Sequence, residues 1–188
     1  VYTANVTLEP RVSRFEIYGF QYTQEGDVPK YTSVKLQKIA LNNYYTQSDF
    51  VSKLPVEDTK VFETIDHTEV WGWIEDRSAP WADELNLELA VGGKKFVDGT
   101  DITDPAEDGE DAAGIITYGL AHVTDAAKNP ELLLALRGVN SNSEVPLYLR
   151  GQFTNASAFT SGKIYRVLYS FTDSDFDEPE RCVELNVD

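Results

Sequence analysis

The sequence predicts an all-β fold, an antiparallel β-sandwich of about seven to nine short strands with long acidic loops. Short runs of alternating apolar and polar residues recur along the chain, and clusters of Gly, Pro, Asn and Asp separate them. These runs do not alternate regularly with long helical stripes, which disfavours a parallel sheet covered by helices. A length of 188 residues and a hydrophobic content of 41% suit one folded domain, residues 1–188.

The first apolar pattern opens the chain. Val6 and Leu8 alternate with polar neighbours, whereas the apolar positions Phe15 and Ile17 lie one residue out of that register. A shift by one residue turns the inward face of a strand outward. The sequence therefore predicts a bulge, or the start of a fresh strand, near residues 13–14.

A second shift of the same kind occurs in the next apolar run. Val34 and Leu36 alternate in one register, and Ile39 and Leu41 alternate one step out of it. The polar pair at residues 37–38 separates the two halves, so we expect a bulge there within one strand.

Residues 80–91 allow two interpretations. Leu85 and Leu89 fit a helical stripe that starts at Trp81, and together with Leu87 they equally fit the inward face of a strand. Short apolar runs do not distinguish these alternatives by periodicity, and we favour the strand. The Gly-Gly pair after this run predicts a hairpin turn.

The end of the chain holds the clearest strand patterns. The run at 162–171 carries on one face four residues that we expect to face the core: Tyr165, Val167, Tyr169 and Phe171. The last run places Val183, Leu185 and Val187 on an apolar face. Its other face is polar, with Cys182, Glu184 and Asn186. The connection at 172–181 is rich in carboxylates, which predicts a surface loop.

The overall charge limits the possible partners. The formal net charge is −16, and a nucleic-acid partner is not expected because phosphate binding needs a basic surface. No apolar run is long enough to span a bilayer. The chain starts at Val1 and contains no methionine, so we expect a mature form or an excised domain. Cys182 is the single cysteine, and we expect it to be a structural residue.

Candidate catalytic and metal-binding patterns are weak. The acidic stretch at 98–111 resembles a calcium loop, but Ala106 occupies a ligand position of the EF-hand pattern and Ile115 stands where its glutamate belongs. His67 and His122 lack metal-ligand spacing. No carboxylate pair stands out for acid–base chemistry. We therefore expect no metal, no cofactor and no enzymatic activity.

Several segments resemble the C-terminal domain of the fimbrillins, the subunits of type V pili of Bacteroidales. The strongest is Gly-Lys-Ile-Tyr-Arg-Val at 162–167, succeeded by a strand ending in Phe, an acidic loop and Cys-Val. The run at 6–17, the Asn-Asn-Tyr-Tyr segment at 42–45, and the runs Leu-Leu-Ala-Leu-Arg-Gly and Pro-Leu-Tyr-Leu-Arg-Gly-Gln-Phe are similar to family strands in the same order. The resemblance covers roughly residues 1–45 and 115–187.

This resemblance implies a transthyretin-like sandwich, the C-terminal domain of a longer two-domain precursor. It further implies export as a lipoprotein, proteolytic processing and assembly into a fimbrium at the cell surface, with other pilus subunits as partners and host or bacterial receptors as adhesion targets. Only a lipid anchor on the precursor would touch the membrane. Assembly in the family proceeds by addition of a donated β-strand. Val183, Leu185 and Val187 are therefore the candidate assembly strand.

A second class of function stays open on the residues alone. Trp71 and Trp73 lie two positions apart and share a face if that segment is extended. Two such rings could form a flat platform for sugar stacking, as in a carbohydrate-binding β-sandwich module of a surface glycan system. The competing interpretation is that these tryptophans cover one end of the sandwich core.

Overall fold

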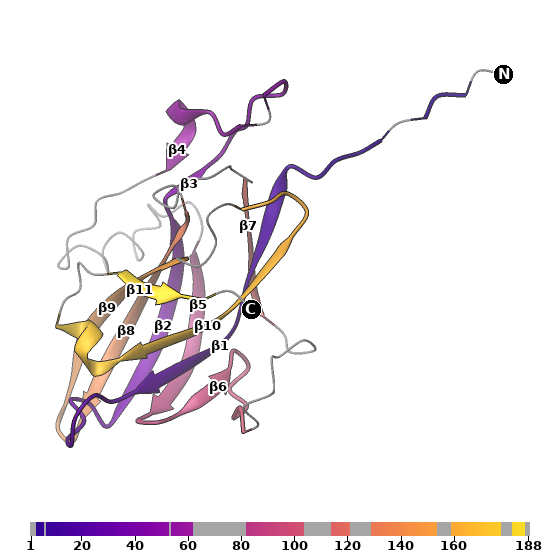
Figure 1. The fold of residues 1–188 in the computed structure, drawn as a ribbon. Coiled ribbons are helices and arrows are strands. Elements are labelled where there is room, and N and C mark those ends of the chain that lie inside the picture. Colours follow the sequence, from indigo (N-terminus) through magenta and orange to yellow (C-terminus); the bar gives the residue numbers. More distant parts are fainter. Residues whose placement is uncertain are drawn as a thin grey trace.

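The computed structural model describes residues 3–5, 7–52, 54–61, 82–103, 114–120, 129–153, 159–177 and 182–186. Within these ranges the chain forms β-strands and two short 3₁₀ turns, η1 (Glu57–Thr59) and η3 (Asp173–Phe176), with no α-helix. Two sheets of four and five strands stack as a sandwich (Figure 1). The predicted all-β sandwich is thus confirmed.

The four-stranded sheet is built around β1 (Val12–Thr23). On one side β10 (Ile164–Thr172) runs parallel to it for nearly its whole length. On the other side β7 (Ile115–Leu120) pairs with the first half of β1 and β6 (Lys94–Phe96) with the second half, both antiparallel. One strand therefore organises this sheet.

The five-stranded sheet has the order β11-β9-β8-β2-β5. Its strands are β2 (Ser33–Asn42), β5 (Ala82–Ala90), β8 (Glu131–Asn140), β9 (Ser143–Phe153) and β11 (Cys182–Leu185). β3 (Tyr44–Tyr45) and β4 (Lys60–Val61) pair with each other as a separate two-stranded ribbon.

Two strand pairs depart from the purely antiparallel arrangement that we expected. β10 runs parallel to β1, and β11 runs parallel to β9. The chain changes sheet twice at its end, from β9 in one sheet to β10 in the other and, after η3, back to β11, so neither pair is joined by a hairpin. Each of the two last strands then joins an edge beside a strand that already runs in its direction.

The core lies between the sheets and is rich in aromatic rings. The predicted inward face of β10 is confirmed, with Val167, Tyr169 and Phe171 at most 2% exposed and Tyr165 half-buried against the cluster. Rings from β1 pack on it: Tyr22 stacks on Phe171 at 5.6 Å and Phe20 on Tyr169 at 6.0 Å between centroids. Such pairs add to the burial of the rings, which dominates the stabilisation of the core.

One predicted bulge is confirmed, and at the other position the alternative of a fresh strand is confirmed instead of a bulge. In β2 the register shifts between Leu36 and Lys38 against both neighbouring strands, as the sequence predicted. β1 starts at Val12, and the described residues before it belong to no strand, which fits a fresh strand near residues 13–14. The bulge within β1 lies farther along, between Ile17 and Gly19.

Residues 82–90 form the favoured strand, with Leu87 and Leu89 buried. The turn after it is not a hairpin, because β5 and β6 lie in different sheets. Gly92 adopts a φ of +77°, which favours glycine, and its N–H donates to the carbonyl of Tyr22 at 2.9 Å. This turn therefore links the two layers.

A close contact between the layers centres on Tyr169. Its hydroxyl donates to the carbonyl oxygen of Leu132 at 3.2 Å. The contact passes Gly151 in β9, where a Cβ would lie only 2.7 Å from the same hydroxyl oxygen. Glycine at this position lets the two sheets approach.

Replacing Tyr169 with Ala should lower the free energy of unfolding by about 3–5 kcal/mol, because it removes a fully buried ring. Urea denaturation monitored by tryptophan fluorescence measures the loss. Tyr118→Ala is the matched control, because Tyr118 lies in the same sheet but is 58% exposed, and its effect should stay within about 0.5 kcal/mol. Equal effects of the two substitutions would contradict the assigned orientation of β10.

Candidate assembly site

The candidate assembly strand lies at an edge of the five-stranded sheet. β11 pairs with residues Arg150–Phe153 of β9. Leu185 is fully buried and Val183 is 8% exposed, whereas Glu184 and Asn186 are exposed, which is the predicted alternation. Val187 lies outside the described residues. The apolar side chains of β11 thus fill the core of their own sandwich, and a role of this strand in assembly stays a prediction.

Most of the other predicted site residues lie outside the described part of the chain. Trp71 and Trp73 lie outside the described residues, as do His67, His122 and the side chain of Cys182. The acidic stretch at 98–111 is described as far as residue 103. Within it, the Asp98 carboxylate accepts the N–H of Thr100 at 2.9 Å. This bond, the largest cause, holds the pKa of the exposed Asp98 below its usual value. The described residues contain no group of three or more potential metal ligands.

The outer edge of β10 is a second candidate for assembly. Among the described residues β10 pairs with β1 alone. The N–H of Arg14 donates to the carbonyl of Lys163 at 2.9 Å, so the odd-numbered residues of β10 direct their backbone groups toward β1. Even-numbered residues then direct N–H and C=O groups to the outer edge, because backbone polar groups alternate along a strand.

The outer face of the same sheet combines an ion-pair cluster with exposed apolar residues. Glu16 on β1 pairs with Arg14 on its own strand and with Arg166 on β10, the latter at 3.4 Å. Around this cluster lie four exposed apolar side chains from three neighbouring strands: Val12, Ile116, Tyr118 and Ile164. Of these two ion pairs, the one between Arg166 and Glu16 connects β10 to β1 on the outer face.

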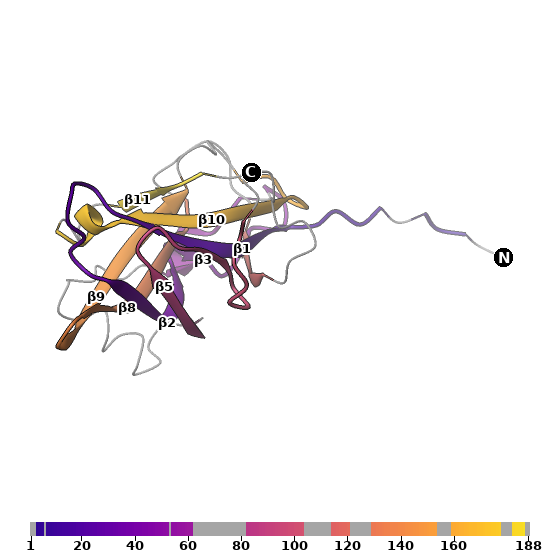
Figure 2. The same cartoon turned by 90° about the horizontal axis from the view of Figure 1, so that it is seen from below.

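The N-terminal arm, residues 3–11, projects away from the sandwich (Figure 1, Figure 2). Leu8 is 89% exposed, and none of the described residues of the arm belongs to a strand. Its base is held where Arg11 donates to the carbonyl of Phe50 at 3.3 Å and lies 5.9 Å from the centre of the Phe50 ring. The sequence showed the alternation of Val6 and Leu8, but the prediction of a strand in this domain is wrong for this stretch.

The loop that contacts the arm is a tight turn with an apolar tip. The carboxylate of Asp49 accepts the N–H groups of Val51 and Ser52 at 3.0 and 2.6 Å. Phe50 and Val51 are 86% and 85% exposed. An isolated bridge between Ser48 and Pro55 closes this loop.

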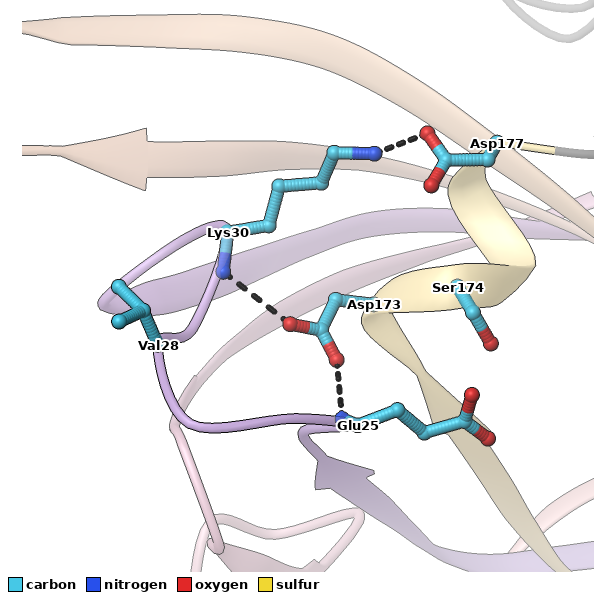
Figure 3. A pocket seen from close by; sticks show the side chains of 6 residues that line it. All are labelled: Glu25, Val28, Lys30, Asp173, Ser174 and Asp177. Atoms are coloured by element: carbon cyan, nitrogen blue, oxygen red, sulfur yellow. Dashed lines mark hydrogen bonds and ion pairs between the residues drawn. The ribbon is translucent and has the colours of Figure 1, made fainter.

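An aspartate clamp closes the opposite end of β10 (Figure 3). Asp173 accepts the backbone N–H groups of Glu25 and Lys30 at 2.8 and 3.1 Å, and Lys30 also forms an ion pair with Asp177. The clamp borders an open hollow of about 230 Å³. Both oxygens of Asp173 already accept backbone N–H groups. We therefore interpret the hollow as the solvent-facing side of these contacts and not as a binding site.

The clamp corrects the prediction that 172–181 is simply a surface loop. Asp173 is only 5% exposed. Thr172 and Asp175 form a capping box around η3, and the ring of Phe176 packs near those of Tyr22, Tyr31 and Phe171. The signals in the sequence were the Thr-x-x-Asp spacing and a lone phenylalanine among carboxylates.

The protonation states around the clamp depend on burial and hydrogen bonding. Burial alone would raise the pKa of the Asp173 carboxyl, but the backbone donors of Lys30 and Glu25 outweigh it and hold the pKa below its usual value. Burial, aided by the charge of Asp173, raises the pKa of Tyr22 to about 12. The clamp is thus a carboxylate beside a neutral tyrosine at neutral pH.

Comparison with known proteins gives a distant structural likeness. No family model and no curated protein matches the chain. Among solved structures it is similar to a crystal structure of a Bacteroides eggerthii protein to which a cell-adhesion role is attributed. Sequence identity is 11%, the TM-score is 0.40, and the likeness covers 94% of this chain and 54% of that one. The chain therefore spans about half the length of that protein.

In the part of the chain that the structure describes, no helix is long and apolar enough to cross a membrane.

Replacing Asp173 with Asn should lower the free energy of unfolding by about 1–3 kcal/mol at pH 7, because the two backbone N–H groups bind different carboxylate oxygens and the substitution turns one of these into an NH2 group that cannot accept. The carboxylate has a lowered folded pKa, so its contribution is present above its unfolded pKa of about 3.9 and is lost as pH falls through the folded value. The difference between wild type and variant should therefore shrink toward pH 3 in urea denaturation.

Asp177→Asn is the control for this experiment, because it removes an exposed carboxylate and an exposed ion pair. Its effect at pH 7 should stay within about 1 kcal/mol. A loss of stability in Asp173→Asn that is equally large at pH 7 and pH 3 would show that the clamp does not depend on the charge.

Proposed function

We propose that this chain is a structural subunit of a cell-surface fimbria, that it assembles with other subunits by β-strand addition, and that the assembly serves adhesion. In this proposal it is the C-terminal domain of a fimbrillin-like protein and has no catalytic role. Its partners are further copies, accessory subunits and receptors on host or bacterial surfaces.

The observation that carries the proposal is where the fimbrillin-like segments lie in the sandwich. The segments that resemble the family lie, in the order of the family's strands, in the first half of β1, at the end of β2 with β3, and in β8, β9, β10 and β11, whereas residues 7–11 of the first segment belong to no strand. These strands supply the central strand of one sheet and four of the five strands of the other. The resemblance therefore falls on the frame of the fold, as a shared architecture requires.

The sheet edges support the mode of assembly. A strand at an open edge presents unpaired N–H and C=O groups that can pair with a strand from another chain. The edge strands β10 and β5 are nine residues long each. A net charge of −16 opposes indiscriminate association, so pairing is favoured only where specific contacts outweigh the repulsion.

The proposal predicts that antibodies against the chain label filaments on the cells that produce the parent protein. Immunogold electron microscopy measures the label, and a strain lacking the gene is the control. Label on the cell body with no filaments would contradict the proposal. If the chain also bound oligosaccharides, and Trp73→Ala abolished that binding, the carbohydrate-binding alternative would replace it.

A further inference from the structure

The N-terminal arm has the sequence of a strand, but its described residues belong to no strand. Over residues 3–10 the apolar or small Ala4, Val6, Leu8 and Pro10 alternate with Thr3, Asn5, Thr7 and Glu9. Such alternation is typical of a strand with one buried face. In the structure every described residue of this stretch is exposed. Leu8 and the other described residues of this stretch are thus not buried in their own sandwich.

The described sheet edges differ in their capacity to accept a strand. β5 is long enough but carries three carboxylates, at Asp83, Glu84 and Glu88, which would repel another acidic chain. β6 and β11 have three and four residues, and β7 has six. β10 has nine residues, with one arginine and no carboxylate. Its outer edge is therefore the best acceptor.

We propose that the N-terminal arm of one copy pairs with the outer edge of β10 in a second copy. This inference rests on the proposed function and names the two segments that would form the subunit contact. The buried face of the added strand would carry Leu8, and the backbone bonds would use the outward groups of Ile164, Arg166 and Leu168.

Length and charge both fit this pairing. At about 3.3 Å per residue the eight residues 3–10 span about 26 Å, and the nine residues of β10 span about 30 Å. Glu9 is the one carboxylate of the arm, and the acceptor side carries two positive charges, those of Lys163 and of Arg166, which already pairs with Glu16. In a chain with a net charge of −16, this is a contact without like-charge repulsion between the two strands.

The geometry favours a contact between copies over one within a copy. The arm points away from the sandwich (Figure 1, Figure 2), and its base is held by the contact of Arg11 with Phe50. β1 itself occupies the inner side of β10, so the arm of the same copy would have to reverse direction and cross the end of β10. Donor and acceptor are different surfaces, so repeated pairing is head-to-tail and generates a filament or ring.

The donor side is tested with two variants that change charge equally. Leu8→Glu places a carboxylate on the apolar face of the arm, and Thr7→Glu places one on the polar face. Sedimentation velocity of the 188-residue chain, from micromolar to millimolar, should show concentration-dependent oligomers. Leu8→Glu should weaken association about tenfold or more, whereas Thr7→Glu should change it less than about threefold.

The acceptor side is tested at Ile164, a half-exposed residue at the start of β10 with its N–H on the outer edge. Ile164→Pro removes that N–H but leaves the pairing with β1, since proline is tolerated at the first residue of an edge strand. Ile164→Ala is the control, because it keeps the N–H. Thermal denaturation establishes that each variant is folded.

Mixing the two defective variants gives the decisive result. Leu8→Glu retains an intact acceptor and Ile164→Pro an intact arm. At a concentration where each variant alone is monomeric and the wild-type chain associates, a 1:1 mixture should therefore form a heterodimer. A mixture that stays monomeric overturns the inference, as does a wild-type chain that is monomeric at millimolar concentration. If wild type and both variants associate equally, the inference fails while the proposed function, judged by labelled filaments, stands.

Discussion

The parallel pairing of β1 with β10 is the constraint on which the rest of the structure depends. It joins the two ends of the chain, with Arg14 opposite Ile164 and Thr23 opposite Thr172. Parallel strands need a long connection, and here the connection contains the whole of the rest of the sandwich apart from β11. The ladder also aligns the inward rings of both strands, so that Phe20 meets Tyr169 and Tyr22 meets Phe171. Core packing between these strands is therefore a consequence of their register.

The same pairing explains the bulge in β1 and the clamp beyond β10. β1 contains one more residue than β10 between their two aligned halves, so Tyr18 is accommodated by the shift before Gly19. Beyond the bulge β1 and β10 end side by side at residues 23 and 172. Directly after β10, Asp173 accepts two backbone N–H groups from the loop at residues 24–32, which follows β1. A buried carboxylate is costly unless its charge is satisfied, and these donors satisfy it. The clamp thus secures the end of the ladder that lies farthest from the arm.

The sequence was informative wherever one side of a strand faces the core. The inward residues of β10, the bulge after Leu36 and the strand at residues 82–90 could all be predicted, because burial imposes a period of two. Pairing direction and sheet membership could not, because alternation is the same in parallel and antiparallel strands. The Gly-Gly pair after Ala90 predicted a hairpin, but β5 and β6 lie in different sheets. A glycine turn allows reversal of the chain but does not specify which sheet the next strand joins.

In the candidate assembly site, too, alternation along the sequence does not tell where a segment lies in the fold. Two segments near the ends of the chain have an apolar face and a polar face, the arm around Leu8 and β11 around Leu185, and their sequences do not distinguish them. The structure does, because Leu185 is fully buried and Leu8 is 89% exposed. To donate β11, the molecule would have to withdraw Val183 and Leu185 from its own core and leave the edge of β9 unpaired. To donate the arm it would give up no contact of Leu8 with its own core. Donating β11 would therefore cost the free energy of its buried contacts, whereas donating the arm would not.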